Sequence, residues 1–284
     1  MSFFALFPGQ GSQSVGMKGG VLVERAESVL GFSLSKLMSE GPEAELTNTA
    51  IAQPAILTAS VAAYREWIQK GGEAPSVAAG HSLGEYSALV AAGAITFEAA
   101  VEVVHLRGKF MQEAVPVGEG GMIAVLGRSE SEVEELLKND AEIANVNAPG
   151  QIVIAGSTVG LARFTERAKE QKVKIIPLAV SAPFHSSLMK PAQEKLAKVL
   201  AELEIDEPEF PVISNVTARA TSSPEEIRAL LIQQVCGRVR WVESVEEALK
   251  EYNVEKAIEF GNGSVLSGLL KKINPEFPRE NYSL

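Results

Sequence analysis

The segment Gly80–Gly84 matches G-x-S-x-G and lies between an apolar run and a stretch of helix formers. Ser76–Ala79 is the apolar run, and Tyr86–Ala92 is the stretch that ends at Gly93. This order of strand, tight turn and helix is typical of a nucleophile elbow, in which flanking glycines allow strand and helix to approach closely. The serine hydroxyl of Ser82 would then lie at a strained tip beside the first N–H groups of the helix. A purely structural turn is the alternative, so the rest of the chain must supply a base.

Composition limits the classes of function. The chain has 284 residues, 46% of them hydrophobic, so it can bury a sizeable core in one large domain or one domain with a smaller insert. A net charge of −10 argues against nucleic acid or an anionic membrane as the main partner. Cys236 is the one cysteine, too few for a disulfide framework or a zinc site. The start Met1–Phe4 lacks the basic residues of a signal peptide, so we expect a cytoplasmic protein. The sequence has no cluster of metal-ligating residues, so we also expect no bound metal.

An apolar run near the start of the chain leads into a glycine-bearing loop. Phe3–Phe7 predicts a buried strand, and Pro8–Gln13 predicts a polar loop after it. The loop is no phosphate-binding P-loop, because Gly16 is followed by Met-Lys instead of Lys-Ser or Lys-Thr. An ordinary turn and one wall of an oxyanion hole remain as interpretations.

Two helical regions follow, at residues 21–38 and from Pro42 to about Gln69. We interpret both as packing helices. Gln53 is polar in an otherwise apolar neighbourhood, and an exposed first helical turn explains it without any function.

A cation interrupts the apolar face of the next helix. Phe97–Val115 begins behind Thr96 as the expected N-cap, and Arg107 lies at the centre of its apolar stripe. The stripe comprises Ala100, Val103, Val104, Met111 and Ala114. One interpretation is that Arg107 reaches the surface along its aliphatic stem or pairs with an internal carboxylate. The other is that it waits in a cleft for an anionic substrate group, whose carboxylate its planar fork could hold with two hydrogen bonds.

A glycine-rich breaker, Pro116–Gly121, precedes three strands that alternate with two helices. The strands are expected at 122–126, 152–155 and 173–178, and the helices at 129–139 and 159–171. The pattern is similar to a small ferredoxin-like α+β unit. We place this unit at 121–181, inserted in a core formed by 1–120 and 182–284. Turn formation is the simpler interpretation of Asn145 and Asn147, with a cleft-facing position as the alternative.

His185, in a loop between a strand and a helix, is the best base available. His81 adjoins Ser82 on a tight turn, where neighbouring side chains diverge, so we interpret it as structural. A hydrolase triad would also need an acid between the serine and the histidine, and Asp140 is the only aspartate there. Because Asp140 falls at the end of a surface helix, a backbone carbonyl could orient His185 instead.

The C-terminal region adds little chemistry. Gly261-Asn262-Gly263 imitates a dinucleotide fingerprint, but Leu266 stands where the third glycine belongs. The residues from Asn274 onward are expected to form a loose tail.

Five separated segments resemble motifs of the malonyl-CoA:acyl carrier protein transacylases of fatty-acid synthesis, and the resemblance runs nearly end to end. They are Phe7–Gln13, Gly80–Glu85, Arg107–Gln112, Asn145–Gly156 and Pro183–Ser186. The resemblance implies an α/β-hydrolase-like core with an inserted ferredoxin-like subdomain. It also implies ping-pong transfer of malonyl from malonyl-CoA to the phosphopantetheine thiol of acyl carrier protein, with no tightly bound cofactor.

The same resemblance assigns roles to single residues. Ser82 would be the nucleophile and His185 the base. Backbone N–H groups of Gln10 and Leu83 would form the oxyanion hole. Arg107 would bind the malonyl carboxylate.

Two further roles follow from the resemblance. The backbone carbonyl of Gln234 would orient His185, and the ring of Phe184 would crowd a substituent at the acyl α-carbon. The chain departs from the family at Arg238 and Asn262, where proline is usual. The first departure bears on the geometry of the loop after Gln234.

We expect a monomer that binds malonyl-CoA and acyl carrier protein but neither nucleic acid nor membrane. A basic patch of Lys190, Lys195, Arg238 and Arg240 could dock the acidic carrier, or these could be solvated charges only. The alternatives in function are a serine thioesterase or esterase that uses the same serine and histidine, and a non-catalytic docking module for carrier protein.

Overall fold

A six-stranded sheet forms the centre of the larger part of the protein, in a computed structural model that describes residues 2–180 and 182–284. Its strand order is β10-β9-β1-β2-β7-β8, and every neighbouring pair is parallel except β7 with β8. The strands are β1 (Phe3–Phe7), β2 (Val77–Gly80), β7 (Val212–Ile213), β8 (Ala220–Thr221), β9 (Lys256–Phe260) and β10 (Arg279–Tyr282). The parallel pairing puts the carboxyl ends of β1 and β2 side by side.

Helices cover both faces of this sheet, as its parallel strands require. Alternate residues of β1 show the division: Phe3 and Phe7 pack with one set of helices, Phe4 and Leu6 with another. The first set is α1 (Leu22–Leu30), α2 (Leu34–Glu40), α3 (Glu43–Leu46), α4 (Thr49–Gln69), α5 (Gly84–Ala91), α6 (Phe97–Glu113), α9 (Lys190–Glu202) and α10 (Pro224–Gln234), with the short 3₁₀ helix η1 (Ser187–Met189) before α9. The second set is α11 (Trp241–Glu251) and α12 (Val265–Ile273).

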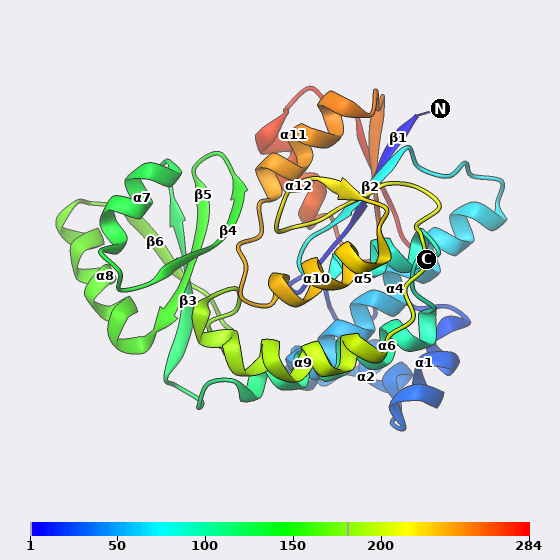
Figure 1. The fold of residues 1–284 in the computed structure, drawn as a ribbon, viewed down its shortest axis with the longest axis horizontal. Coiled ribbons are helices and arrows are strands. Elements are labelled where there is room, and N and C mark those ends of the chain that lie inside the picture. The colour runs from blue at the N-terminus through cyan, green and yellow to red at the C-terminus, as the bar shows by residue number, and fades with distance from the viewer. Residues whose placement is uncertain (1, 181) are drawn as a thin grey trace.

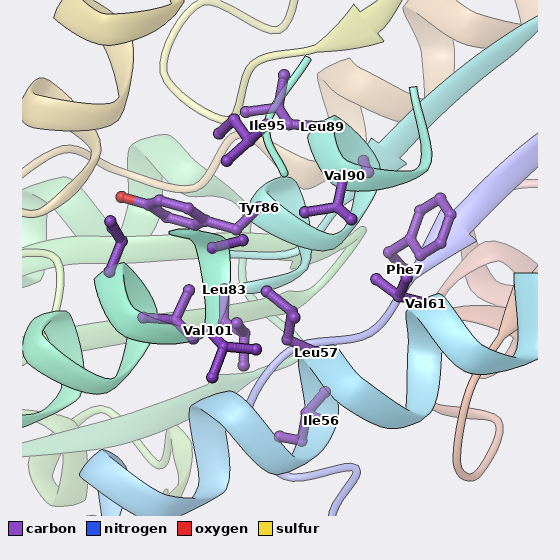
Figure 2. Close-up of a cluster of buried hydrophobic side chains, with 14 of the residues drawn as sticks. Phe7, Ile56, Leu57, Val61, Leu83, Tyr86, Leu89, Val90, Ile95 and Val101 are labelled. Atoms are coloured by element: carbon purple, nitrogen blue, oxygen red, sulfur yellow. The ribbon is translucent and has the colours of Figure 1, made fainter. Parts of the chain in front are cut away.

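The core on the first face joins the elbow to the rest of the fold. Figure 2 shows Phe7 of β1, Leu57 of α4 and Tyr86 of α5 among the apolar side chains that gather there. Leu83, the residue after Ser82, is 1% exposed in this core. Packing of Leu83 in this core therefore fixes the turn that carries Ser82.

A second sheet lies to one side of the first (Figure 1). It has four antiparallel strands in the order β4-β5-β3-β6. Its elements are β3 (Gly120–Leu126), α7 (Glu130–Leu137), β4 (Glu142–Ala148), β5 (Gln151–Ser157), α8 (Thr158–Glu170) and β6 (Lys174–Pro177). Ile123 and Val125 pack under α7 and α8, whereas Met122 and Ala124 of the same strand face the larger part of the protein. The second sheet thus presents one apolar face to the first unit.

Three expectations about secondary structure are wrong. Residues 21–38 form the two helices α1 and α2, because Gly31 adopts a left-handed φ of 74° and ends α1, and the second predicted region likewise contains two helices, α3 and α4. The segment from Asn274 is no loose tail, since β10 pairs with β9. The second sheet has the additional strand β4, which contains Asn145 and Asn147, two residues for which the sequence favours a turn.

Candidate active site

Ser82 stands at the tip of a sharp turn between β2 and α5. Its backbone has a φ of 53°, in the left-handed region that non-glycine residues rarely adopt. The turn packs closely on the end of β1, because a Cβ added to Gly84 would lie 2.0 Å from the carbonyl oxygen of Phe7. The strand–turn–helix context that the motif predicts is therefore confirmed.

His185 contacts Ser82 directly. Its Nε2 lies 2.7 Å from Ser82 Oγ, and its Nδ1 lies 2.9 Å from the carbonyl oxygen of Gln234 and 3.0 Å from that of Gly237. Both oxygens can only accept, so the proton of the neutral ring is on Nδ1 and Nε2 is free to accept from the serine hydroxyl. Asp140 takes no part, because it is paired with Arg163 and Arg167.

The surroundings keep His185 neutral. Burial, followed by the charge of Arg107 and by His81, lowers the pKa of His185 to about 3. A neutral imidazole is the form that can take a proton from Ser82 at physiological pH.

We therefore expect the rate at which an activated ester acylates Ser82 to change by less than about twofold between pH 7.5 and pH 5.5, because the lowered pKa of His185 leaves this base unprotonated. A histidine with the ordinary pKa near 6.5 would lose roughly tenfold over that range. Rapid-quench measurement of the acyl-enzyme at each pH tests this. The same measurement on Glu85→Gln removes any contribution from titration of the neighbouring Glu85 carboxyl. A tenfold fall in both proteins would contradict a lowered pKa of His185.

Arg107 is fully enclosed, with 1% of its surface exposed. Its Nη2 donates to Ser82 Oγ at 3.1 Å and to Gln234 Oε1 at 2.8 Å, and its Nη1 donates to Gln53 Oε1 at 2.9 Å. Burial lowers the pKa of Arg107, but an arginine pKa is high enough that the guanidinium stays charged. Its hydrogen-bond partners within the described residues are all neutral groups, and its Nε has none.

The position of Gln53 corrects the interpretation made from sequence. Gln53 is 1% exposed and holds Arg107, so it does not lie in an exposed first turn. Sequence placed it on α4 correctly, but only the packing of α4 against α6 brings its carboxamide to the arginine.

Two further polar residues beneath the elbow were missed. Glu85 Oε2 accepts from the backbone N–H of Asn215 at 2.9 Å and from Gln234 Nε2 at 2.8 Å. Burial raises the pKa of Glu85 to about 7. The Asn215 side chain accepts from the N–H of Ser82 at 2.6 Å and donates to the carbonyl of Gly80 at 2.7 Å. The place of Glu85 directly after the G-x-S-x-G segment could have indicated that it lies near Ser82. No pattern in the sequence indicates Asn215.

A cavity of about 350 Å³ opens above these groups, between the two sheets. Its polar lining includes Ser82, His185 and Arg107, and its apolar lining includes Met122 and Phe184. Other residues around it are Gln10, Gln53, Leu83, Asn145 and Asn147. Asn147 Oδ1 lies 2.8 Å from His81 Nε2, so the cleft-facing alternative holds for this asparagine.

Two backbone donors border the same cavity. The N–H groups of Gln10 and Leu83 donate no hydrogen bond to any residue the structure describes. They come from the loop after β1 and from the elbow, two segments that the parallel pairing of β1 with β2 brings together.

The four cations of the predicted basic patch are largely engaged in contacts within the protein. Arg238 pairs with Glu130 and with Glu134, the latter at 3.2 Å. Arg240 pairs with Glu243, and Lys195 with Glu113 at 3.5 Å. Lys190 donates to the carboxamide of Gln193. For the two arginines and Lys195, these ion pairs favour the interpretation as ordinary solvated charges over that of a free basic patch.

Neither a metal-binding cluster nor a membrane-spanning helix is found in residues 2–180 and 182–284. No group of three or more His, Cys, Asp or Glu side chains there is arranged to hold a metal ion. No helix in those ranges combines the length and the apolar character needed to cross a bilayer.

A serine–histidine pair on a strand–turn–helix elbow, in a two-sheet α/β fold, is the arrangement of enzymes that handle acyl groups on serine. Residues 4–263 match the family of the acyl transferase domain. The chain belongs to this acyltransferase family, and within it to the malonyl CoA-acyl carrier protein transacylases. The resemblance found in the sequence is thus confirmed.

Individual relatives match over nearly the whole chain. The malonyl CoA-acyl carrier protein transacylase of Escherichia coli (strain K12) is 45% identical over 286 residues, covering 95% of this chain and 92% of the relative. A solved acyl carrier protein S-malonyltransferase of Vibrio cholerae has a TM-score of 0.96 and 43% identity, covering 100% of this chain and 97% of that one. A malonyl-transacylase solved with its type II polyketide-synthase acyl-carrier protein has a TM-score of 0.95 and 44% identity, covering 99% and 96%.

Proposed function

We propose that this acyltransferase moves a malonyl group from malonyl-CoA to the phosphopantetheine thiol of an acyl carrier protein, through a malonyl ester on Ser82. The observation that carries the proposal is the buried guanidinium of Arg107, 3.1 Å from Ser82 Oγ and bonded to neutral groups. In the part of the chain that the structure describes, no carboxylate is hydrogen-bonded to Arg107, since Glu85 is linked to it only through Gln234. A buried guanidinium without a directly bonded carboxylate is costly, so the site favours an acyl group that brings its own carboxylate.

In the first half-reaction, Ser82 Oγ attacks the thioester carbonyl of malonyl-CoA and its proton passes to His185 Nε2. The carbonyl oxygen becomes an oxyanion, which the N–H groups of Gln10 and Leu83 stabilise. When the carbon–sulfur bond breaks, the coenzyme A thiolate takes the proton from His185. Malonyl-Ser82 and free coenzyme A result.

In the second half-reaction, the carrier thiol gives its proton to His185 and attacks the ester carbonyl. The same two N–H groups bind the oxyanion, and Ser82 leaves with the proton returned from His185. Because His185 Nδ1–H donates to the carbonyl of Gln234, the ring keeps its orientation through both transfers.

Substrate choice rests on two side chains. Arg107 turns from Ser82 Oγ to the malonyl carboxylate, which it binds with two parallel hydrogen bonds. Phe184, 7% exposed at the cavity wall, crowds any substituent on the carbon between the two carbonyl groups. The expected order of acyl groups is malonyl before methylmalonyl before acetyl.

The remaining assignments are part of the same proposal. The relative solved with its acyl-carrier protein supports such a carrier as partner. The strand order β4-β5-β3-β6 with two helices on one face supports a ferredoxin-like subdomain at 121–181 in an α/β-hydrolase-like core of 1–120 and 182–284. Its stated end, Ser181, lies outside the described residues. We also propose a cytoplasmic monomer without a tightly bound cofactor.

The test is mass spectrometry of the protein after mixing with malonyl-CoA. We expect malonyl mass on the peptide that contains Ser82, and its loss when phosphopantetheinylated carrier protein is added. Carrier protein without phosphopantetheine is the control and should leave the adduct in place. Absence of any adduct would favour a docking module, and release of free malonate faster than transfer would favour a thioesterase.

A further inference from the structure

The loop that carries the Gln10 N–H has few external contacts. Gly9–Ser12 is a turn closed on itself, since the Ser12 N–H and hydroxyl both donate to the Gly9 carbonyl, at 3.3 and 2.9 Å. At one end the loop packs on the elbow, where a Cβ added to Gly9 would lie 2.3 Å from the carbonyl oxygen of His81. The other end of the turn needs support from elsewhere.

Asn262, about 250 residues later, supplies that support. Its Nδ2 donates to the Ser12 carbonyl at 2.6 Å and to Ser14 Oγ at 3.0 Å. The other described side chain from outside that hydrogen-bonds the segment from Gly9 to Ser14 is Thr49, at a longer 3.3 Å to Gln10 Nε2. Asn262 lies two residues after the end of β9, and β9 pairs with β1, so the contact joins the loops that follow two neighbouring strands.

We propose that Asn262 is a positioning residue that fixes the turn Gly9–Ser12 and thereby aims the Gln10 N–H at the oxyanion. The inference rests on the proposed function, which assigns Gln10 to the oxyanion hole. A donor contributes most when it is held where the negative charge develops. A loosened turn therefore reduces stabilisation of the transition state more than binding of the ground state. The substrate carboxylate is bound elsewhere, by Arg107, and its binding should not depend on Asn262.

The expected result for Asn262→Ala is a fall in kcat of about tenfold, part of the roughly 10²–10³-fold that follows loss of a whole oxyanion donor. The fall should be equal for malonyl-CoA and acetyl-CoA, with KM and the melting temperature nearly unchanged. Asn262→Asp keeps the size of the side chain but lacks both N–H donors, and should behave alike. Ser14→Ala removes only the longer bond and should lose less.

The matched control is Asn281→Ala. Asn281 donates to the Gly263 carbonyl at 2.8 Å and to Glu259 at 3.2 Å, so it holds the same loop after β9 without touching Gly9–Ser14. An equal loss in this control, a loss confined to malonyl, or unchanged kcat in both Asn262 variants would overturn the inference.

Hydrolysis of p-nitrophenyl acetate at Ser82 separates this inference from the proposed function. It forms the same oxyanion but needs neither the malonyl carboxylate nor carrier protein. If wild type cleaves the ester without transferring malonyl, the proposed function fails, and slower cleavage by Asn262→Asp would still support the positioning role.

Discussion

Replacing Arg107 with alanine is expected to lower kcat/KM for malonyl transfer by roughly 30-fold to a few thousand-fold, or about 2 to 5 kcal/mol, as for truncation of a buried charge partner. Acetyl transfer should fall much less. The physical reason is that Arg107 is 1% exposed and is the cation beside Ser82 in the cavity, so the malonyl carboxylate would be buried without a counter-ion. Parallel assays with malonyl-CoA and acetyl-CoA measure the difference.

Two variants sharpen the interpretation. Arg107→Lys keeps a charge but loses the planar fork, so it should restore part of the preference for malonyl. Arg65→Ala is the control, because the Arg65 guanidinium lies over the ring of Phe97, 5.6 Å from its centre, and takes no part in the cavity. Equal losses for both acyl groups in Arg107→Ala would rule out carboxylate binding by Arg107.

Features that depend on local pattern could be predicted from the sequence. The elbow at Ser82 needed only a short apolar strand, two glycines and a helix, all contiguous. Arg107 was identifiable because a cation on the apolar face of α6 contradicts the periodicity around it. In both places the residues that reveal the feature lie close together in the sequence.

Features that depend on long-range packing could not be predicted in this way. The amide of Gln53 and the carboxyl of Glu85 become part of the site only when α4, α5 and α10 meet around Arg107. Asn215 reaches the elbow across 133 positions of sequence. A single polar residue in an apolar segment does not reveal which distant partner will satisfy it.

The strand β4 was missed for a related reason. Asn145 and Asn147 interrupt the apolar pattern of Glu142–Ala148, and both are turn-forming residues by local preference. In the structure both line the cavity, and Asn147 is paired with His81. The two asparagines break the continuous apolar run by which a buried strand is recognised, so local preference favours a turn at a place where the polar side chains line a functional cavity.

Replacing His185 with alanine is expected to lower malonyl transfer by roughly 10²–10⁴-fold, the contribution of a positioned general base. Nε2 lies 2.7 Å from Ser82 Oγ, and the described residues hold no second base at that hydroxyl, since its other neighbour is the cation Arg107. Ser82→Ala should remove transfer as well, and the double variant should be no worse, because the pair acts as a unit. Acyl-enzyme formation, measured by rapid quench, reports the step directly.

Added imidazole gives the readout that separates lost chemistry from lost structure in His185→Ala. The carbonyls of Gln234 and Gly237 still face the vacated space and can accept from a bound imidazole N–H, so we expect partial recovery that saturates with imidazole. His105→Ala is the matched control, since His105 bonds to the carbonyl of Ala50 and should keep nearly full activity. Activity above about a tenth of wild type in His185→Ala would show that proton transfer does not depend on this ring.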